Sequence, residues 1–317
     1  MDRYVFFLFV VVLSISIFGA DFEKSNVAKQ GINGNDSTVK VFYNPFLVGG
    51  ASLVVPGAGQ MYTNHYFKGG MFLAFEVITA STAIYWLNDA ELTKSATKKL
   101  RLKAELDTGI SRIRGTNDAD LSMYDERYSR YRGYNTLAWA SGLYVYNVLD
   151  AIQCSNIIDK SGTRNPLAAG LLSAVPGLAL GQWYNGSISK AGMIFMGQMS
   201  MGVVALNYHR LMNDAGNKYL KTKTDYDLHI VNASALGRDT LALSANRGRY
   251  MDSWESKRSS AFKYRNTYLW YSIFFYCYGI FDAVIDAHLH DFPEKMRMYP
   301  DLIPQSDGAL LNLNVKF

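Results

Sequence analysis

A short apolar motif built on Pro-Gly occurs twice in this chain and constrains its fold more than any other feature. Residues 52–62 and 173–184 both begin with Ser and contain Pro-Gly, a later Gly-Gln pair and Tyr. In both stretches a lysine follows the glutamine eight residues later, and a small residue, Gly and Met come next. Proline and several glycines within a dozen apolar residues predict a bent or re-entrant segment rather than a straight helix. The motif residues are Pro56, Gly57, Gly59, Gln60, Tyr62 and Lys68 in the first stretch and Pro176, Gly177, Gly181, Gln182, Tyr184 and Lys190 in the second.

The similarity continues beyond the motif and predicts two tandem copies of one unit. After the motif, each copy has an apolar run, a long polar insert ending in Tyr-Arg, and a further apolar run ending near Asp150 or Asp282. Repetition of a whole unit is the signature of an internal duplication. The predicted bounds are 46–160 for the first copy with its insert at 88–133, and 161–290 for the second copy with its insert at 208–266.

The apolar runs favour a membrane protein although the mean hydropathy of the chain is only −0.05. Runs of roughly 16 to 20 apolar residues, about the length that crosses a bilayer, alternate with very polar stretches. The chain also has 22 Tyr, a residue favoured where a chain passes between hydrocarbon and water. The predicted fold class is therefore all-α, a polytopic helical membrane protein in which each copy consists of a Pro-Gly hairpin, a helix, a polar insert and a helix.

Charge favours one topology over another. Lys and Arg outnumber Asp and Glu in both polar inserts, which places both on the cytoplasmic side. Two spans and a re-entrant hairpin in each copy satisfy this condition with four spans and parallel repeats. Three spans in each copy would give six spans and inverted repeats, an alternative that remains open because inserts of this length can be translocated despite their charge.

The two ends of the chain have their own signals. Residues 1–20 have a polar start, an apolar stretch and a small-residue end, which predicts a signal peptide or an N-terminal anchor. Residues 21–45 are predicted to be a flexible lead. The tail at 291–317 ends in alternating apolar and polar residues from Gly308, a strand-like period similar to the last strand of outer-membrane barrels.

The inserts are not uniform. Residues 89–114 carry leucines and isoleucines among charges in a rough helical stripe without proline, which predicts an amphipathic helix. The second insert contains Gly216, Gly237 and Gly248 and is expected to mix helix and loop.

Ionisable residues in the apolar runs are the functional candidates, because burying such groups in a bilayer is costly. Asp150 and Asp282 occupy equivalent places, so they could form a pair across one interface, bridged by a proton or an ion. In the preferred alternative, each accepts hydrogen bonds near a helix end or pairs with the lysine of its own copy. The complete set is Glu76, Asp150, Asp282, Asp286 and His288.

Metal and cofactor chemistry is not expected. Asp286 and His288 point in different directions on a helix, and no third spaced ligand accompanies them. Cys154 and Cys277 match no metal spacing and are expected to be buried thiols. Nucleophile-elbow, zinc-protease, dinucleotide and P-loop motifs are absent, so no catalytic residue is predicted.

Two motifs of the chain carry a family resemblance. Pro56-Gly-Ala-Gly-Gln-Met-Tyr62 and the late Asp282-Ala-Val-Ile-Asp-Ala-His-Leu289 resemble the motifs of a bacterial membrane group catalogued as domain of unknown function number 5683. The resemblance covers most of residues 46–289 and implies membrane location and helices without any known activity. The chain departs from the pattern where the first copy ends in Ile152-Gln153-Cys154, without the second Asp and the His.

Three functions are compatible with these features. The preferred one is a non-enzymatic scaffold or assembly component of the bacterial envelope. The second is a channel or transporter that uses the duplicated hairpins and the intramembrane aspartates, and the third is an intramembrane enzyme using Asp282, Asp286 and His288. The expected partners are the lipid bilayer and other envelope proteins or a second copy of the chain, with no nucleic acid. The inner membrane is favoured over the outer.

Overall fold

The computed structural model describes residues 43–155, 163–290, 298–305 and 308–315, and these residues form eight helices and one small β-hairpin. The predicted helical fold class is confirmed. The predicted signal peptide or anchor and nearly all of the flexible lead lie outside the described residues. The helices are α2 (Pro45–Val54), α3 (Ala58–Tyr62), α4 (Tyr66–Leu106), α5 (Gly109–Cys154), α6 (Pro166–Ser173), α7 (Leu180–Tyr184), α8 (Ile188–Ala235) and α9 (Leu241–Leu289).

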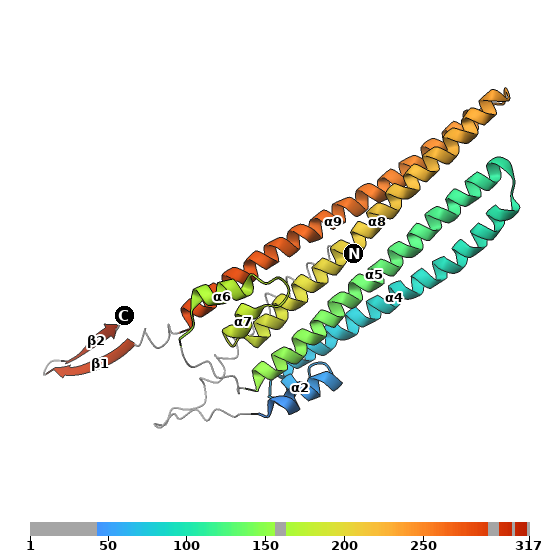
Figure 1. The fold of residues 1–317 in the computed structure, drawn as a ribbon. Helices are drawn as coiled ribbons and strands as arrows, with labels where there is room; N and C mark the ends of the chain where they lie inside the picture. The colour runs from blue at the N-terminus through green and yellow to red at the C-terminus, as the bar shows by residue number, and fades with distance from the viewer. Residues whose placement is uncertain (1–42, 156–162, 291–297, 306–307, 316–317) are drawn as a thin grey trace.

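Four very long helices dominate the molecule and lie side by side in the order α4, α5, α8, α9 (Figure 1). They contain 41, 46, 48 and 49 residues, so each is about 60 to 75 Å long at 1.5 Å per residue. α4 and α5 form one antiparallel hairpin, α8 and α9 form a second, and α5 packs against α8. Both hairpins turn at the same end of the molecule, while the short helices α2, α6 and α7 lie at the opposite end (Figure 1).

The polar inserts are continuations of the apolar helices, not separate elements. α4 runs from the apolar run through the first insert to Leu106 without a break, and α5 returns after a two-residue turn. We call residues 88–133 and 208–266 the stalk, and the helical remainder of residues 45–289 the base. The amphipathic stripe predicted at 89–114 is thus divided between two helices, because the chain turns at Asp107 and Thr108.

The second insert contains helix and loop as predicted, but the loop is confined to residues 236–240 between α8 and α9. α8 passes through Gly216 and α9 through Gly248, and only Gly237 lies in the turn, with φ of 65°. A glycine inside a helix costs only about 1 kcal/mol relative to alanine, and packing of α8 against α9 along their length offsets this cost.

The short helices of the base begin at defined signals. Asn44 accepts a hydrogen bond from the Phe46 amide at 2.9 Å, and Pro45 occupies the first position of α2. Asn165 accepts from the Leu167 amide at 2.9 Å in the same way, ahead of Pro166 in α6. An Asn cap followed by proline is a strong helix start, so the sequence itself fixes where both hairpin segments begin.

Charged side chains join the two long hairpins along the stalk. Asp120 of α5 pairs with Lys218 of α8 at 2.7 Å. Asp125 of α5 pairs with Lys257 of α9 at 2.5 Å. Because α5 supplies acids and the second hairpin supplies bases at these contacts, the seam between the hairpins is electrostatically complementary.

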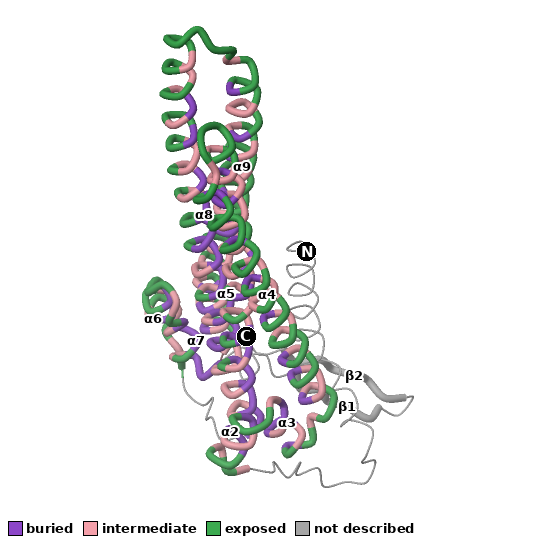
Figure 2. The backbone as a smooth tube through the Cα atoms, turned by 90° about the vertical axis from the view of Figure 1, so that its right-hand side faces the viewer, coloured by how far each residue is buried: buried purple, intermediate pink, exposed green. Residues whose placement is uncertain are grey.

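Many large apolar side chains of the base are exposed. Buried residues concentrate on α5 and α8 (Figure 2). Among the described residues, α4 and α9 are the two helices long and apolar enough to cross a membrane. These are the two outer helices of the layer, and little of their apolar stretch is buried inside the protein. Exposed apolar surface on this scale marks a face that meets something other than water.

The tail ends in a β-hairpin. β1 (Met298–Gln305) pairs antiparallel with β2 (Gly308–Val315), with Met298 opposite Val315 and Gln305 opposite Gly308. The strand predicted from the alternation after Gly308 is therefore present, and β1 is an addition that the alternation did not indicate.

Candidate functional site

The first Pro-Gly segment is a tight helix–turn–helix held by its glycines. α2 ends at Val54, and α3 begins after Gly57, whose φ is 85°. A side chain at Gly57 would place its Cβ 2.0 Å from the carbonyl oxygen of Gly69, so glycine is required there both by conformation and by space. A Cβ at Gly59 would lie 2.2 Å from the Val48 carbonyl oxygen. These contacts bring α2, α3 and the start of α4 together and leave no room for side chains between them.

Gln60 is the polar centre of this segment and is completely buried. Its Oε1 accepts a hydrogen bond from Ser52 Oγ at 3.0 Å. Its Nε2 donates to the Asn147 carbonyl oxygen at 2.8 Å and to Asp150 Oδ2 at 3.1 Å. One glutamine therefore ties the hairpin to the end of α5, using both its donor and its acceptor.

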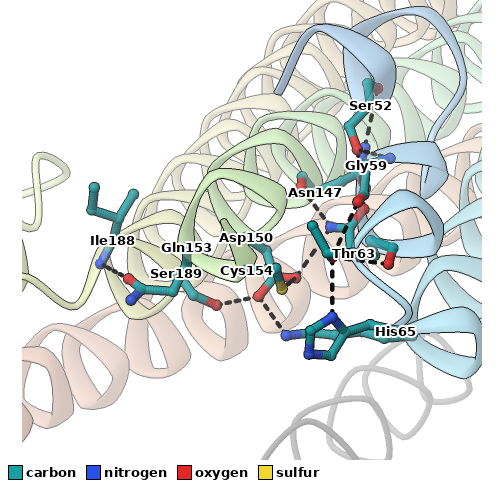
Figure 3. Close-up of polar contacts among 12 residues, drawn as sticks. Ser52, Gly59, Thr63, His65, Asn147, Asp150, Gln153, Cys154, Ile188 and Ser189 are labelled. Atoms are coloured by element: carbon teal, nitrogen blue, oxygen red, sulfur yellow. Dashed lines mark hydrogen bonds and ion pairs between the residues drawn. The ribbon is translucent and has the colours of Figure 1, made fainter. Parts of the chain in front are cut away.

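Asp150 joins three helices at this point (Figure 3). Its side chain is fully buried, and Lys68 of α4 pairs with Oδ1 at 2.7 Å. Ser189, at the start of α8, donates to the same oxygen at 2.5 Å. The adjacent Gln153 accepts a hydrogen bond from the Ile188 amide at 2.9 Å. The cluster thus links the first half of the chain to the second.

The second Pro-Gly segment repeats the central contacts of the first. Ser173 Oγ donates to Gln182 Oε1 at 3.4 Å, and Gln182 Nε2 donates to the Gly279 carbonyl oxygen at 2.6 Å. The same nitrogen lies 3.5 Å from Asp282 Oδ2. Lys190 pairs with Asp282 at 3.2 Å. The same types of side chain therefore lie in the same order in both clusters: serine, glutamine, aspartate and lysine.

The second cluster carries one more acid than the first. Asp286 Oδ1 lies 3.0 Å from Lys190 Nζ, and Ser187 donates to Asp286 Oδ2 at 2.6 Å. Cys154 lies one helical turn after Asp150, as Asp286 lies one turn after Asp282. One lysine thus serves two carboxylates in the second cluster and one in the first, and the second cluster is also more exposed.

The turn of the second segment differs because three residues separate Gly177 from Gly181, whereas one residue separates Gly57 from Gly59. α6 ends at Ser173 and α7 begins at Leu180, with Pro176 and Gly177 in the turn between them. Ala179 precedes α7 in the left-handed conformation that Gly57 adopts before α3, with φ of 50°. Gly177 also has a positive φ, 80°, and its amide donates to Gln198. The close approach at Gly181 matches that at Gly59, with a built Cβ 2.3 Å from the Ala169 carbonyl oxygen.

The remaining predicted residues lie around these clusters. The Tyr62 ring packs edge-on against Tyr43 with centroids 5.6 Å apart, and Tyr184 accepts from the Asn165 amide at 3.1 Å. Pro56 lies in the first turn. Cys154 is buried as predicted, whereas the prediction of a buried thiol is wrong for Cys277, which is exposed on the outer helix α9. His288 is exposed near the end of α9 and makes no polar contact with any described residue.

Glu76 lies apart from both clusters. It is in the middle of the apolar part of α4, and its Oε1 is buried without a hydrogen-bond partner among the described residues. The described part of the chain contains no group of three His, Cys, Asp or Glu residues positioned for a metal.

Several contributors to the clusters were not predicted from the sequence. Asn147 accepts from the Gly57 amide at 3.0 Å, and Ser189 reaches Asp150 from the other half of the chain. Tyr144 and Tyr276 donate to the carbonyl oxygens of Leu53 and Ala174, one in each half. The equal spacing from Tyr144 to Asp150 and from Tyr276 to Asp282 is a signal that could have identified the tyrosine pair.

Both clusters hold helices together by polar contacts. Each aspartate is paired with a lysine and hydrogen-bonded to a glutamine, so its charge is compensated within its own half. Buried polar groups that satisfy one another in this way fix the relative positions of the elements that carry them.

Comparison with known proteins gives one match. The model of a family of unknown function, DUF5683, matches residues 43–157 and again residues 162–315. The two matches divide the chain where the sequence predicts two tandem copies. No curated protein and no solved structure was found to be similar to this chain.

Proposed function

The chain belongs to DUF5683, a family of unknown function, and we propose that it is a non-enzymatic scaffold of the bacterial envelope in which a membrane-embedded helical base carries a rigid stalk. The observation that carries this proposal is the continuity of the long helices. α4, α5, α8 and α9 each run from the apolar base into the polar stalk without a break. A continuous helix transmits position over its whole length, so the stalk holds its tip at a fixed place relative to the base.

The dimensions of the base support a position in the bilayer. From Tyr66 to Trp86 α4 covers about 30 Å, the thickness of the hydrocarbon core. At the end of this stretch the Arg132 guanidinium lies 3.7 Å from the Trp86 ring centroid. Tryptophan and arginine are residues typical of the membrane–water interface. The Lys68–Asp150 pair lies at the opposite end of the stretch, where a charged pair can reach water.

The Pro-Gly segments support four spans with parallel repeats. α2 has 10 residues and is about 15 Å long, which is half of what a crossing needs. With the short segments re-entrant, the four long helices are the spans, and both stalk hairpins lie on one side. Lys and Arg exceed Asp and Glu in both stalk hairpins, which favours the cytoplasmic side and the inner membrane.

Cysteine labelling tests this topology. We expect Thr108→Cys and Arg238→Cys, placed in the two stalk turns of a Cys154→Ala, Cys277→Ser chain, to react with a membrane-impermeant maleimide only after cells are permeabilised. A cysteine at Leu178, in the turn of the second Pro-Gly segment, is the comparison for the opposite end. Labelling of the two stalk turns from opposite sides would reject parallel repeats. Release of the chain from membranes by alkaline carbonate would reject the membrane base altogether.

A channel or transporter is the competing function, and the clusters argue against it. The cluster aspartates are poorly suited to hold a transported ion, because Asp150 already has a lysine, a glutamine and a serine as partners. Glu76, whose Oε1 has no hydrogen-bond partner among the described residues, lies outside both clusters. Liposomes containing the purified chain should therefore show no cation or proton flux above that of empty liposomes. Flux that disappears in Asp150→Asn and Asp282→Asn would overturn the scaffold proposal.

A further inference from the structure

The outer face of α4 in the stalk is an unoccupied edge of the helical layer. α4 packs mainly on α5, through buried small residues at a spacing of seven: Ala83, Ala90, Thr97 and Ala104. A residue two positions further along a helix is turned by about 200°. Leu92, Lys99 and Leu106 each follow a seam residue by two positions, so they lie on the side of α4 that points away from α5.

This outer face combines exposed leucines with lysines. Leu92, Leu102 and Leu106 have 71%, 60% and 79% of their surface exposed. Lys99 and Lys103 lie among them, one turn apart, and both are exposed. Neither lysine makes an ion pair with any residue that the structure describes. The face therefore offers apolar contact and uncompensated positive charge along the same stripe.

The other edge of the layer has a different character. The corresponding outward residues of α9 in the stalk are mainly polar, apart from Leu241 and Phe262. The exposed set includes Asp252, Glu255, Ser256, Ser260 and Lys263. Bases elsewhere in the stalk, such as Lys218 and Lys257, are already paired across the seam between the hairpins. Leu220 of α8 also lies one turn from an exposed lysine, Lys223, but α8 packs between α5 and α9, whereas α4 is an outer helix of the layer.

The geometry decides which partner fits. The stripe from Leu92 to Leu106 runs along the stalk for about 20 Å, so a flat bilayer surface facing the stalk tip could touch only its end. A second copy of the chain that presented its own α4 would bring lysines against lysines. A helix with leucines on one side and acidic residues beside them matches both the apolar stripe and the charge, and would add a further helix to the open layer.

From this match we infer that the α4 face formed by Leu92, Lys99, Leu102, Lys103 and Leu106 is a docking surface for an acidic amphipathic helix of a partner protein. The inference rests on the proposed scaffold function, and it supplies the partner chemistry that a scaffold needs. Steering by the lysines would make association sensitive to salt, while the leucines would supply the contact area.

Peptide binding to the full chain in nanodiscs of zwitterionic lipid tests the inference. The probe is a fluorescein-labelled 21-residue synthetic helix with leucine at its heptad core positions and glutamate beside them, followed by anisotropy. The matched control peptide has lysine in place of every glutamate. We expect the acidic peptide to bind at least about tenfold more tightly than the control, and its affinity to fall as salt rises.

Variants of the chain locate the binding. Two variants should each weaken binding of the acidic peptide by about tenfold or more. They are the double variant Lys99→Glu, Lys103→Glu and the single variant Leu102→Gln. Lys263→Glu on the outer face of α9 is the matched control and should leave affinity unchanged. These positions are exposed, and an unchanged circular dichroism spectrum verifies that the helices are intact.

Three results would overturn the inference. They are no binding of the acidic peptide, binding insensitive to both α4 variants, or binding of phosphatidylglycerol vesicles in place of the peptide with the same sensitivity to Lys99→Glu. The assay is independent of the proposed function, because a chain extracted from membranes by carbonate or labelled from both sides would fail the topology tests whatever the peptide does.

Discussion

The two long hairpins have the same architecture but are packed with side chains of very different size. In the α4–α5 hairpin the seam is lined by small residues, and Thr97 bonds to Ser122 at 2.7 Å across it. A Cβ added to Gly115 would lie 2.9 Å from the Ala104 Cβ, so the two helices are nearly in backbone contact there. The α8–α9 hairpin is packed by large rings, among them the stacked Tyr208 and Tyr264 with centroids 5.0 Å apart.

This difference shows that one backbone arrangement can be stabilised in two ways. Helices that pack closely and are joined by hydroxyl groups require small side chains between them. Helices held together by aromatic rings require large side chains there. The first hairpin should therefore be damaged by enlarging residues and the second by truncating them. The following variants test that contrast, each by the thermal unfolding of the detergent-solubilised chain followed by circular dichroism.

The largest effect is expected from Trp254→Ala in the second hairpin. Trp254 is fully buried and meets the Tyr124 ring edge-on at 5.8 Å. Removing a ring of this size from a packed core costs about 3 to 5 kcal/mol, which should appear as a clear fall in the unfolding midpoint. Trp270→Ala, at an exposed position of the same helix, is the control. Equal losses in the two variants would show that the structure does not depend on the buried ring of Trp254, by which α9 meets Tyr124 of α5.

The two aspartate clusters should differ in the same assay. Asp150→Asn leaves Lys68 without its counterion in a buried cluster, and we expect a loss of about 2 kcal/mol, reduced from the fully buried case because Lys68 is partly exposed. Asp282→Asn should cost less than about 1 kcal/mol, because Lys190 keeps Asp286 at 3.0 Å.

A double variant tests whether the loss of stability in Asp150→Asn comes from leaving the charge of Lys68 unpaired. Adding Lys68→Met to Asp150→Asn should recover part of the loss, since no charge is then left unpaired. Equal losses for Asp150→Asn and Asp282→Asn would indicate that the extra acid of the second cluster gives Lys190 no alternative partner.

The sequence predicted those contacts of the site whose residues recur at the same spacing in both copies. Gln60 and Lys68, like Gln182 and Lys190, stand eight residues apart in both halves, and both pairs converge on an aspartate. Ser189 could not be found in this way, because its bond to Asp150 joins the two halves and has no counterpart within one copy. Comparison of the two copies in the sequence predicts contacts within each copy but does not predict contacts between the copies.

The extent of the helices was underestimated for a related reason. Charged residues after Trp86 mark a change of surroundings, from lipid to water in the proposed arrangement, and the insert predicted at 88–133 places the end of the helix there. The seam itself continues unchanged, since Ala83, Ala90 and Ala104 fit one spacing of seven across the boundary. The pattern of buried residues therefore indicates how long a helix is, and the exposed residues indicate what surrounds it.

Enlarging the small seam of the first hairpin should have the next largest effect. Ala90 is buried against α5, and Ala90→Leu forces the helices apart at a cost of about 1 to 2 kcal/mol. Ala96→Leu on an exposed part of the same helix is the matched control and should leave the midpoint nearly unchanged. A neutral Ala90→Leu would mean that the two helices are not held close by their small residues.

A similarly small effect is expected from a tyrosine of the second hairpin at high pH. Burial, followed by the hydrogen bond to Asp118 at 2.6 Å, raises the pKa of the Tyr250 hydroxyl above its usual value. Because the pKa of an unfolded tyrosine is about 10, the resulting stability is fully present below that pH. It is lost as the pH rises from about 10 through the higher pKa of the folded chain. The midpoint of the natural chain should therefore fall more between pH 9 and pH 11 than that of Tyr250→Phe, whose loss at neutral pH should be about 1 kcal/mol. Tyr85→Phe, at an exposed position of α4, should keep the full pH dependence, and an equal slope in all three chains would exclude Tyr250 as its source.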